Sequence, residues 1–200
     1  DSSGSSQASD EMFLDIIIPE YANSLQFSLD GETLPNALID LYVNEQLYHT
    51  TRAEDDGTFV FTRVVLDPVQ PNDVRIVGRE SVYSDSIEVS GVVKVDDKDP
   101  KFLSSTNLPR SLRTSSVPFN ANFSEQVDVV VEIQRDGTDT ETETVAQNAS
   151  SVSHSIALSE GTSLIIIRAI DRAGNTAMIS QEVTVDTEAP RFLEDNLGDI

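Results

Sequence analysis

The sequence predicts an all-β protein made of two antiparallel β-sandwiches in tandem. The segment Val95-Asp-Asp-Lys-Asp-Pro-Lys-Phe102 returns as Val185-Asp-Thr-Glu-Ala-Pro-Arg-Phe192, and the copies are 185 − 95 = 90 residues apart. A motif repeated at about the length of one small sandwich indicates two copies of one module. Short segments of alternating apolar and polar residues, separated by turn-forming residues, supply the strands, and helical periodicity is nowhere sustained.

The first half contains seven predicted strands, each an alternating segment bounded by turn residues. They lie near residues 13–18, 24–29, 37–43, 46–52, 58–65, 73–79 and 86–95. The turn signals between them are Asp30-Gly31, Asn44-Glu45, Asp56-Gly57, Pro68 with Pro71-Asn72, and Ser84-Asp85. These residue pairs favour the tight turns that connect antiparallel strands.

The second half repeats this plan. Its strongest predicted strand carries Val127, Val129, Val131 and Ile133 ahead of a turn at residues 135–138. Residues 138–146 form a polar, Thr-rich segment without an apolar face, which suits an edge strand whose Glu141 and Glu143 oppose sheet-to-sheet association. Later inward positions are predicted at Ile156, Leu158, Ile165, Ile167, Ala169, Val183 and Val185.

The predicted organisation has four parts. Residues 1–12 are a flexible polar leader, 13–98 a first domain, 99–188 a second domain, and 189–200 the start of a further module or a tail. Residues 191–193 (Arg-Phe-Leu) repeat the pattern of Lys101-Phe-Leu, which favours a further module. With 38% hydrophobic residues, each half can bury a core of its own.

Composition limits the partners. The chain has 35 acidic and 13 basic residues and a formal charge of −22, which opposes binding to nucleic acid or to an anionic membrane surface. No apolar run approaches the roughly 20 residues that span a bilayer, so we expect no membrane insertion in this segment. The chain has no cysteine, so apolar packing must hold the sandwiches together without a disulfide.

The sequence offers few residues for catalysis, and we predict that the chain is not an enzyme. There is no cysteine nucleophile, and the two histidines, His49 and His154, lie in predicted strands. Ser153 cannot reach His154, because neighbouring residues of a strand point to opposite faces.

The joint between the halves is the best candidate for a metal site. Asp96, Asp97 and Asp99 stand within four residues beside Pro100, and calcium takes six to eight oxygen ligands. In a seven-stranded sandwich the turn between the last two strands lies at the end where the first strand begins. Asp171 and Asn175 should therefore face this joint, and the turn near Glu125 should reach the same end. A plain solvated acidic linker is the alternative, and Asp171 with Asn175 can also simply close a tight turn.

Two motifs carry a resemblance to a known family. Leu158-Ser-Glu-Gly, followed by alternating apolar residues, Asp171-Arg-Ala-Gly-Asn175 and Val183-Thr-Val-Asp-Thr-Glu-Ala-Pro190, resembles the closing half of bacterial immunoglobulin-like (Big-type) repeats. The first half resembles the same family through residues 31–44 and 55–61 but has Arg79-Glu-Ser-Val-Tyr-Ser-Asp85 where Asp-x-Ala-Gly-Asn would stand. The acidic joint resembles the calcium-rigidified linkers of cadherins.

The resemblance implies two tandem immunoglobulin-like β-sandwiches in an exported, repetitive cell-surface protein, often an adhesin or stalk. It implies no fixed ligand. We therefore expect a non-enzymatic extracellular spacing or display module whose contacts are neighbouring repeats and other surface proteins or glycans. The alternatives are a carbohydrate- or protein-binding module, which could add a strand at residues 138–146, and an accessory domain of an exported enzyme.

Overall fold

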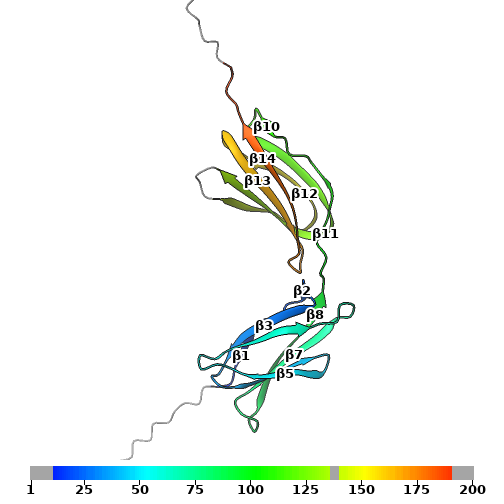
Figure 1. The fold of residues 1–200 in the computed structure, drawn as a ribbon, viewed down its shortest axis with the longest axis vertical. Helices are drawn as coiled ribbons and strands as arrows, with labels where there is room; N and C mark the ends of the chain where they lie inside the picture. The colour runs from blue at the N-terminus through cyan, green and yellow to red at the C-terminus, as the bar shows by residue number, and fades with distance from the viewer. Residues whose placement is uncertain (1–10, 136–139, 191–200) are drawn as a thin grey trace, which may run out of the picture. The chain divides into compact units, whose positions relative to one another are not determined.

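The computed structural model describes residues 11–135 and 140–190, and every regular element among them is a strand (Figure 1). The chain divides into two compact units, Asp1–Lys98 and Asp99–Ile200. The predicted all-β fold of two antiparallel sandwiches is confirmed. The polar leader at residues 1–10, most of the predicted turn at 135–138, and residues 191–200 lie outside the described part of the chain.

The first unit packs two sheets against each other. The smaller sheet has the order β1-β3-β6, with β1 at Leu14–Ile16, β3 at Gln26–Thr33 and β6 at Thr58–Val65. The larger has the order β2-β8-β7-β4-β5, with β2 at Tyr21–Ala22, β8 at Ser86–Val95, β7 at Asn72–Arg79, β4 at Leu38–Val43 and β5 at Gln46–Arg52. All seven predicted strands are present, and the two-residue β2 is an addition that the sequence did not indicate.

The core of the first unit lies between the two sheets and is formed by alternate residues of the strands. Its fully buried members include Ile39, Leu41, Val64, Val74, Ile76 and Val93. Asn44 and Glu45 both have positive φ, at 51° and 65°, so they form the predicted two-residue turn between β4 and β5.

The predicted turn at Asp30-Gly31 is wrong, because β3 continues through both residues to Thr33. A Cβ atom on Gly31 would lie 2.7 Å from the backbone oxygen of Asp15 and 2.7 Å from Cζ of Phe59. Glycine at this position therefore allows β1 to approach β3 closely, rather than allowing the chain to reverse.

The second unit follows the same plan with longer strands. They are β9 (Phe102–Ser105), β10 (Ser111–Leu112), β11 (Ser116–Arg135), β12 (Glu141–Ala157), β13 (Gly161–Ile170) and β14 (Thr176–Val185). The order is β10-β14-β13-β11-β12, and β9 pairs with β11. The pairing of β11 with β12 breaks register between Asn122 and Val127. The first half of β11 pairs with β9 and its second half with β13, so β11 serves both layers of the sandwich.

The inward positions predicted for the second unit are buried, from Val127 to Ile133 on β11 through Val183 and Val185 on β14. Among the described strands, β12 pairs with β11 alone, so its polar beginning, from Glu141, forms a sheet edge as predicted. The predicted lack of an apolar face is wrong in one respect. Val145 and Ala146 pack against the core, because β12 bends there and runs on into the opposite layer.

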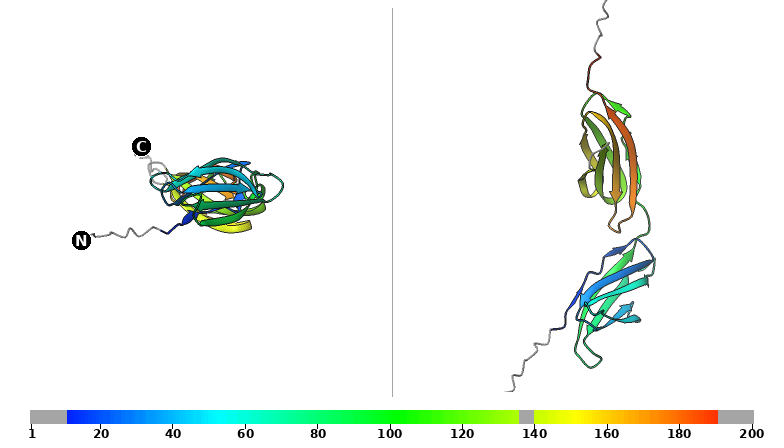
Figure 2. Two further views of the ribbon diagram at one scale, coloured as in Figure 1. Left: turned by 90° about the horizontal axis from the view of Figure 1, so that it is seen from below. Right: turned by 60° about the vertical axis from the view of Figure 1, so that its left-hand side comes forward.

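Each unit contains one parallel strand pair. Tyr21 and Ala22 of β2 pair with Lys94 and Val95 of β8, and Ser111–Leu112 of β10 pairs with Thr184–Val185 of β14. A short strand near the start of the unit therefore runs in the same direction as its last strand. The chain thus enters each sandwich at one end and leaves it at the other, as the ribbons of both units show (Figure 2).

Candidate functional site

The joint is anchored to its own unit at each end. The Asp96 N–H donates to the carbonyl of Ala22 at 2.9 Å, which extends the β2–β8 pairing by one residue. At the other end, the Lys101 N–H donates to Ser124 Oγ at 2.9 Å, and the Ser124 N–H donates back to the carbonyl of Lys101 at 2.9 Å. The start of the second unit is therefore held beside the bend of β11.

The turn between β13 and β14 is closed by Asp171. Its Oδ1 accepts the N–H groups of Ala173 at 2.8 Å and Asn175 at 2.9 Å, and its Oδ2 accepts Nδ2 of Asn175 at 2.8 Å. Gly174 supplies the positive φ of 89° that the turn requires. Both Asp171 and Asn175 are buried, so these bonds satisfy polar groups that water cannot reach. The residues thus have the turn-closing role that their sequence pattern allowed.

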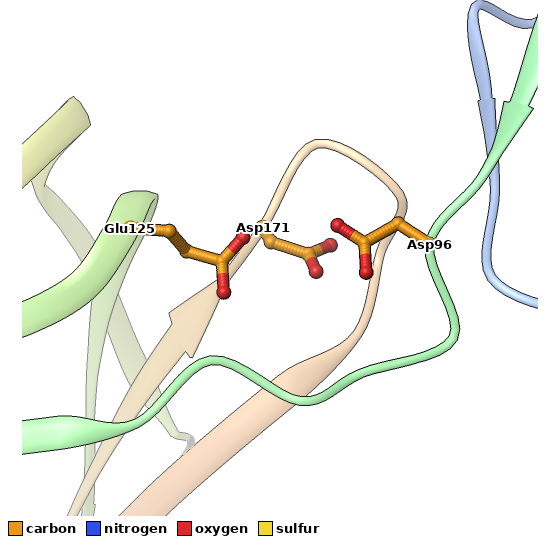
Figure 3. Close-up of side chains that lie close together, drawn as sticks. All are labelled: Asp96, Glu125 and Asp171. Carbon is orange, nitrogen blue, oxygen red and sulfur yellow. The ribbon is translucent and has the colours of Figure 1, made fainter. Parts of the chain in front are cut away.

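Glu125 brings a second carboxylate to this turn. It lies in the bend of β11, and one of its oxygens is within 4.8 Å of an oxygen of Asp171 (Figure 3). Two carboxylates this close repel each other unless a cation or a proton offsets the charge. The same figure labels Asp96, which directly follows β8. The pair of Glu125 and Asp171 is the acidic centre of the second unit at its N-terminal end.

Arg172 donates hydrogen bonds to residues in the bends of β11 and β12, at the N-terminal end of the second unit. Its Nη2 lies 3.0 Å from Oε1 of Gln126 and 3.0 Å from Oδ1 of Asn148, in a small pocket beside Asp171. Asn148 has a positive φ of 48°, and its N–H donates to Asp128 Oδ1 at 2.8 Å. One guanidinium therefore links the β13–β14 turn to the bends of β11 and β12 and offsets part of the local negative charge.

The structure places the five predicted metal ligands in two groups. Asp171 and Asn175 are in contact in one turn, whereas Asp96, Asp97 and Asp99 belong to the joint, where Asp99 is exposed. Glu125 joins Asp171, at the end of the sandwich where topology predicted it. Sequence reasoning missed Arg172 and Asn148. Their partnership depends on where β11 and β12 bend, and no local pattern marks that place.

The histidines have ordinary strand surroundings. His49 on β5 lies edge-on to Phe61 with ring centroids 6.2 Å apart. His154 on β12 has its Nε2 3.6 Å from a carboxylate oxygen of Glu143. Ser153 is exposed and faces away from His154, as strand alternation predicted.

Comparison with known proteins identifies the fold. No protein-family model and no curated protein matches the chain. The fibronectin(III)-like modules of CbhA from Clostridium thermocellum are 13% identical, with a TM-score of 0.59, covering 92% of this chain and 100% of that one. The FN1–FN3 domains of chicken CNTN1 are 12% identical, with a TM-score of 0.50, covering 85% and 66%. The chain has the tandem immunoglobulin- and fibronectin-III-like fold.

A weaker likeness is to a tetra-tandem repeat in the extending region of a large adhesion protein. It is 16% identical and covers 88% of this chain and 50% of that one, and its TM-score of 0.36 is too low to support an inference. At these identities the likenesses show the fold and leave function to the chemistry of the chain. Among the described residues, no helix has the length and apolar character needed to cross a bilayer.

Proposed function

We propose that this chain is a non-enzymatic segment of an extracellular surface protein, a stalk or adhesin repeat that spaces and displays other parts. The observation that supports this function best is the direction of the chain within each sandwich. The parallel pairs β2–β8 and β10–β14 make it enter at one end and leave at the opposite end. Modules built in this way add length when they are joined in series.

The repeated joint supports the same function. We propose that each unit folds on its own as a Big-type module, with a first domain at 13–98 and a second at 99–188, and that residues 189–200 begin a further module or form a tail. Residues 96–101 are too few to form a long flexible tether, and Pro100 restricts their backbone. The charge of −22 opposes unspecific aggregation of neighbouring chains.

Length measurements on concatenated copies test the stalk. Proteins with one, two and three copies of residues 11–190 are compared by small-angle scattering, each with a matched control in which Gly and Ser replace residues 96–100. A stalk predicts that the maximum dimension rises by a constant increment per copy and that the glycine-serine controls are shorter on average. Copies that collapse to a compact particle would overturn the proposal.

We also propose that calcium binds at the start of the second unit. Glu125, Asp171 and Asn175 offer ligand oxygens within the second unit, where Lys101 is bonded to Ser124 next to Glu125. Asp96, Asp97 and Asp99 offer further carboxylates in the joint. Carboxylate and amide oxygens are the ligands that calcium prefers. Neutralising these charges would stiffen the joint in the manner of a cadherin linker.

Calcium titration of a neutralised variant tests this site. The triple change Asp96→Asn, Asp97→Asn and Asp99→Asn should abolish calorimetric binding and any rise of melting temperature in millimolar calcium. The matched control neutralises three exposed acids of the first unit, Asp30, Glu54 and Asp85, and should bind as the wild type does. If calcium leaves the wild type unchanged in stability and in maximum dimension, the joint is a solvated acidic linker.

The exposed edge of β12 favours a second candidate function, in which the module binds another protein by adding a strand to its sheet. β12 pairs with β11 alone among the described strands, and its exposed residues from Glu141 to Thr144 leave one side of the backbone for a new strand. Replacing Glu143 with Thr should promote such pairing, with slower amide exchange at residues 141–146. Unchanged exchange at high protein concentration would exclude an available edge.

A further inference from the structure

The second unit carries apolar residues on the outer face of its sheet, where β13 lies between β14 and β11. On β13, Ile165, Ile167 and Ala169 are completely buried, and the residues between them point to the opposite side of the sheet. Those residues are largely apolar, partly exposed and absent from the core cluster. Val130 and Glu132 of β11 and Met178 of β14 lie beside them, and together these residues form the centre of a face, here named the β13 face. The border of the face is polar and consists of Asp128, Gln134, Thr176, Ser180 and Glu182.

The corresponding face of the first unit is different. β7 takes the place of β13 there, and on this face the charged side chains of Arg75, Arg79, Asp40 and Glu88 separate the apolar residues Tyr42, Val77 and Val92. A solvated outer face normally has this polar character. On the β13 face, Met178 is 62% exposed and the outward isoleucines of β13 are partly exposed, so apolar surface is within reach of a partner.

The charged residues of the β13 face have a definite arrangement. Nε of Arg168 lies 2.7 Å from Oε1 of Glu132. In the sheet, Val130 is paired with Arg168 and Glu132 with Ile166. These four residues form a rectangle, because neighbouring strands lie about 4.8 Å apart and alternate residues of one strand lie about 7 Å apart. The apolar pair occupies one diagonal and the charged pair occupies the other.

We propose that the β13 face binds the same face of a second copy of this chain. A two-fold axis along the diagonal through Val130 and Ile166 places each of these side chains against its own counterpart. The same rotation brings the other two corners close to each other's positions, so Arg168 of each copy comes within reach of Glu132 of the second copy. The face is thus self-complementary, because apolar side chains meet apolar side chains and each arginine meets a glutamate. This pairing would join neighbouring chains sideways, and it does not depend on the stalk function.

The net charge makes this contact weak and dependent on salt. Two chains of −22 each repel one another, and a contact built on about half a dozen side chains is small for a stable interface. Salt screens the repulsion between the chains over distances beyond about 10 Å at 0.1 M. Association should therefore be reversible, favoured at high protein concentration, and stronger in high salt than in low salt.

Sedimentation equilibrium of residues 11–190 tests the proposal with a matched pair of variants. The wild type should show a monomer–dimer equilibrium, and Ile166→Glu should weaken it by roughly tenfold or more, because it places a charge at the centre of the contact. Val92→Glu is the control, since Val92 is 46% exposed on the corresponding face of the first unit. It should dimerise as the wild type does. Melting curves confirm that both variants remain folded.

Reversing the charge of Glu132 or of Arg168 tests the two-fold axis of the proposed dimer. Glu132→Arg alone and Arg168→Glu alone each place like charges across the two-fold axis, so either variant should be monomeric. An equimolar mixture of the two restores opposite charges at both corners and should form a heterodimer. A wild type that remains monomeric at millimolar concentration in high salt, or a mixture that remains monomeric, overturns the proposal, and the β13 face would then be left to a different protein.

Discussion

Arg79 and Asp40 form an ion pair on the outer face of the larger sheet of the first unit, with Nη2 of the arginine 2.6 Å from Oδ2 of the aspartate. The other carboxylate oxygen, Oδ1, accepts the hydroxyl of Thr50 at 2.6 Å. The side chain of Asp40 is only 5% exposed, whereas that of Arg79 is 28% exposed. A carboxylate buried to this extent is tolerated because both of its oxygens have partners.

Removing the arginine should therefore destabilise the first unit. Arg79→Met leaves the Asp40 carboxylate buried without its counter-ion, and we expect a loss of about 3 kcal/mol. All four tyrosines of the chain, Tyr21, Tyr42, Tyr48 and Tyr83, lie in the first unit, so tyrosine fluorescence during urea unfolding reports on that unit alone.

Arg75→Met is the matched control for this change. The pair of Arg75 with Glu88 is longer, at 3.3 Å, and both side chains are largely exposed. Such pairs contribute little, so the loss should be about 1 kcal/mol or less. Equal losses for the two variants would contradict the proposed importance of burial.

The turn at Asp171 yields a prediction for the second unit. Asp171→Ala removes the acceptor of three hydrogen bonds, two of them donated by the buried Asn175, so we expect a loss of about 2 kcal/mol. The second unit has no tyrosine, and its unfolding is therefore followed by circular dichroism, with the tyrosine signal as an internal control. Asp186→Ala, a change at an exposed carboxylate, should have little effect. A loss of the same size in EDTA and in calcium would assign Asp171 to turn closure alone.

The sequence predicts those parts of the fold that local alternation determines. Val127 to Ile133, Ile165 to Ala169, and Val183 with Val185 alternate clearly because each strand buries one side. The two-residue strands β2 and β10 are too short to show a period, and they form through parallel pairing with strands more than 70 residues away. The continuous bends of β11 and β12, and with them Arg172 and Asn148, depend on the joining of two layers. Such features follow from pairing between distant segments, which a single sequence does not display.

Gly31 should be essential for docking β1. Gly31→Ala places a Cβ atom against the backbone oxygen of Asp15 and the ring of Phe59, neither of which can yield easily. We expect β1 to separate from β3, with loss of amide-exchange protection at Leu14–Ile16 and a lower unfolding midpoint. Gly78→Ala is the control, because its new Cβ meets only the flexible end of Met12 at such a short distance. It should be tolerated better, and equal effects would show that space beside β1 is not the determining factor.

The loop before β7 should make stability depend on pH through Asp67. Its Oδ1 accepts the N–H groups of Gln70 at 3.0 Å and Val69 at 2.7 Å, and these bonds lower the pKa of Asp67 below its ordinary value of 3.8. A carboxyl with a lowered pKa in the folded state contributes stability above its ordinary pKa and loses it as pH falls through the lower folded value.

Asp67→Asn keeps an acceptor oxygen but removes the charge, so its melting temperature should be lower than that of the wild type at pH 7. The difference should shrink as pH falls below about 4, where the wild-type carboxyl gains its proton. Asp85→Asn, at an exposed carboxyl that accepts no hydrogen bond among the described residues, corrects for the change in net charge. Melting curves by tyrosine fluorescence between neutral and strongly acidic pH measure both variants. If the difference in melting temperature between the Asp67 variant and its control stays constant over that range, the two backbone N–H groups do not stabilise the charged carboxylate of Asp67 over the protonated form.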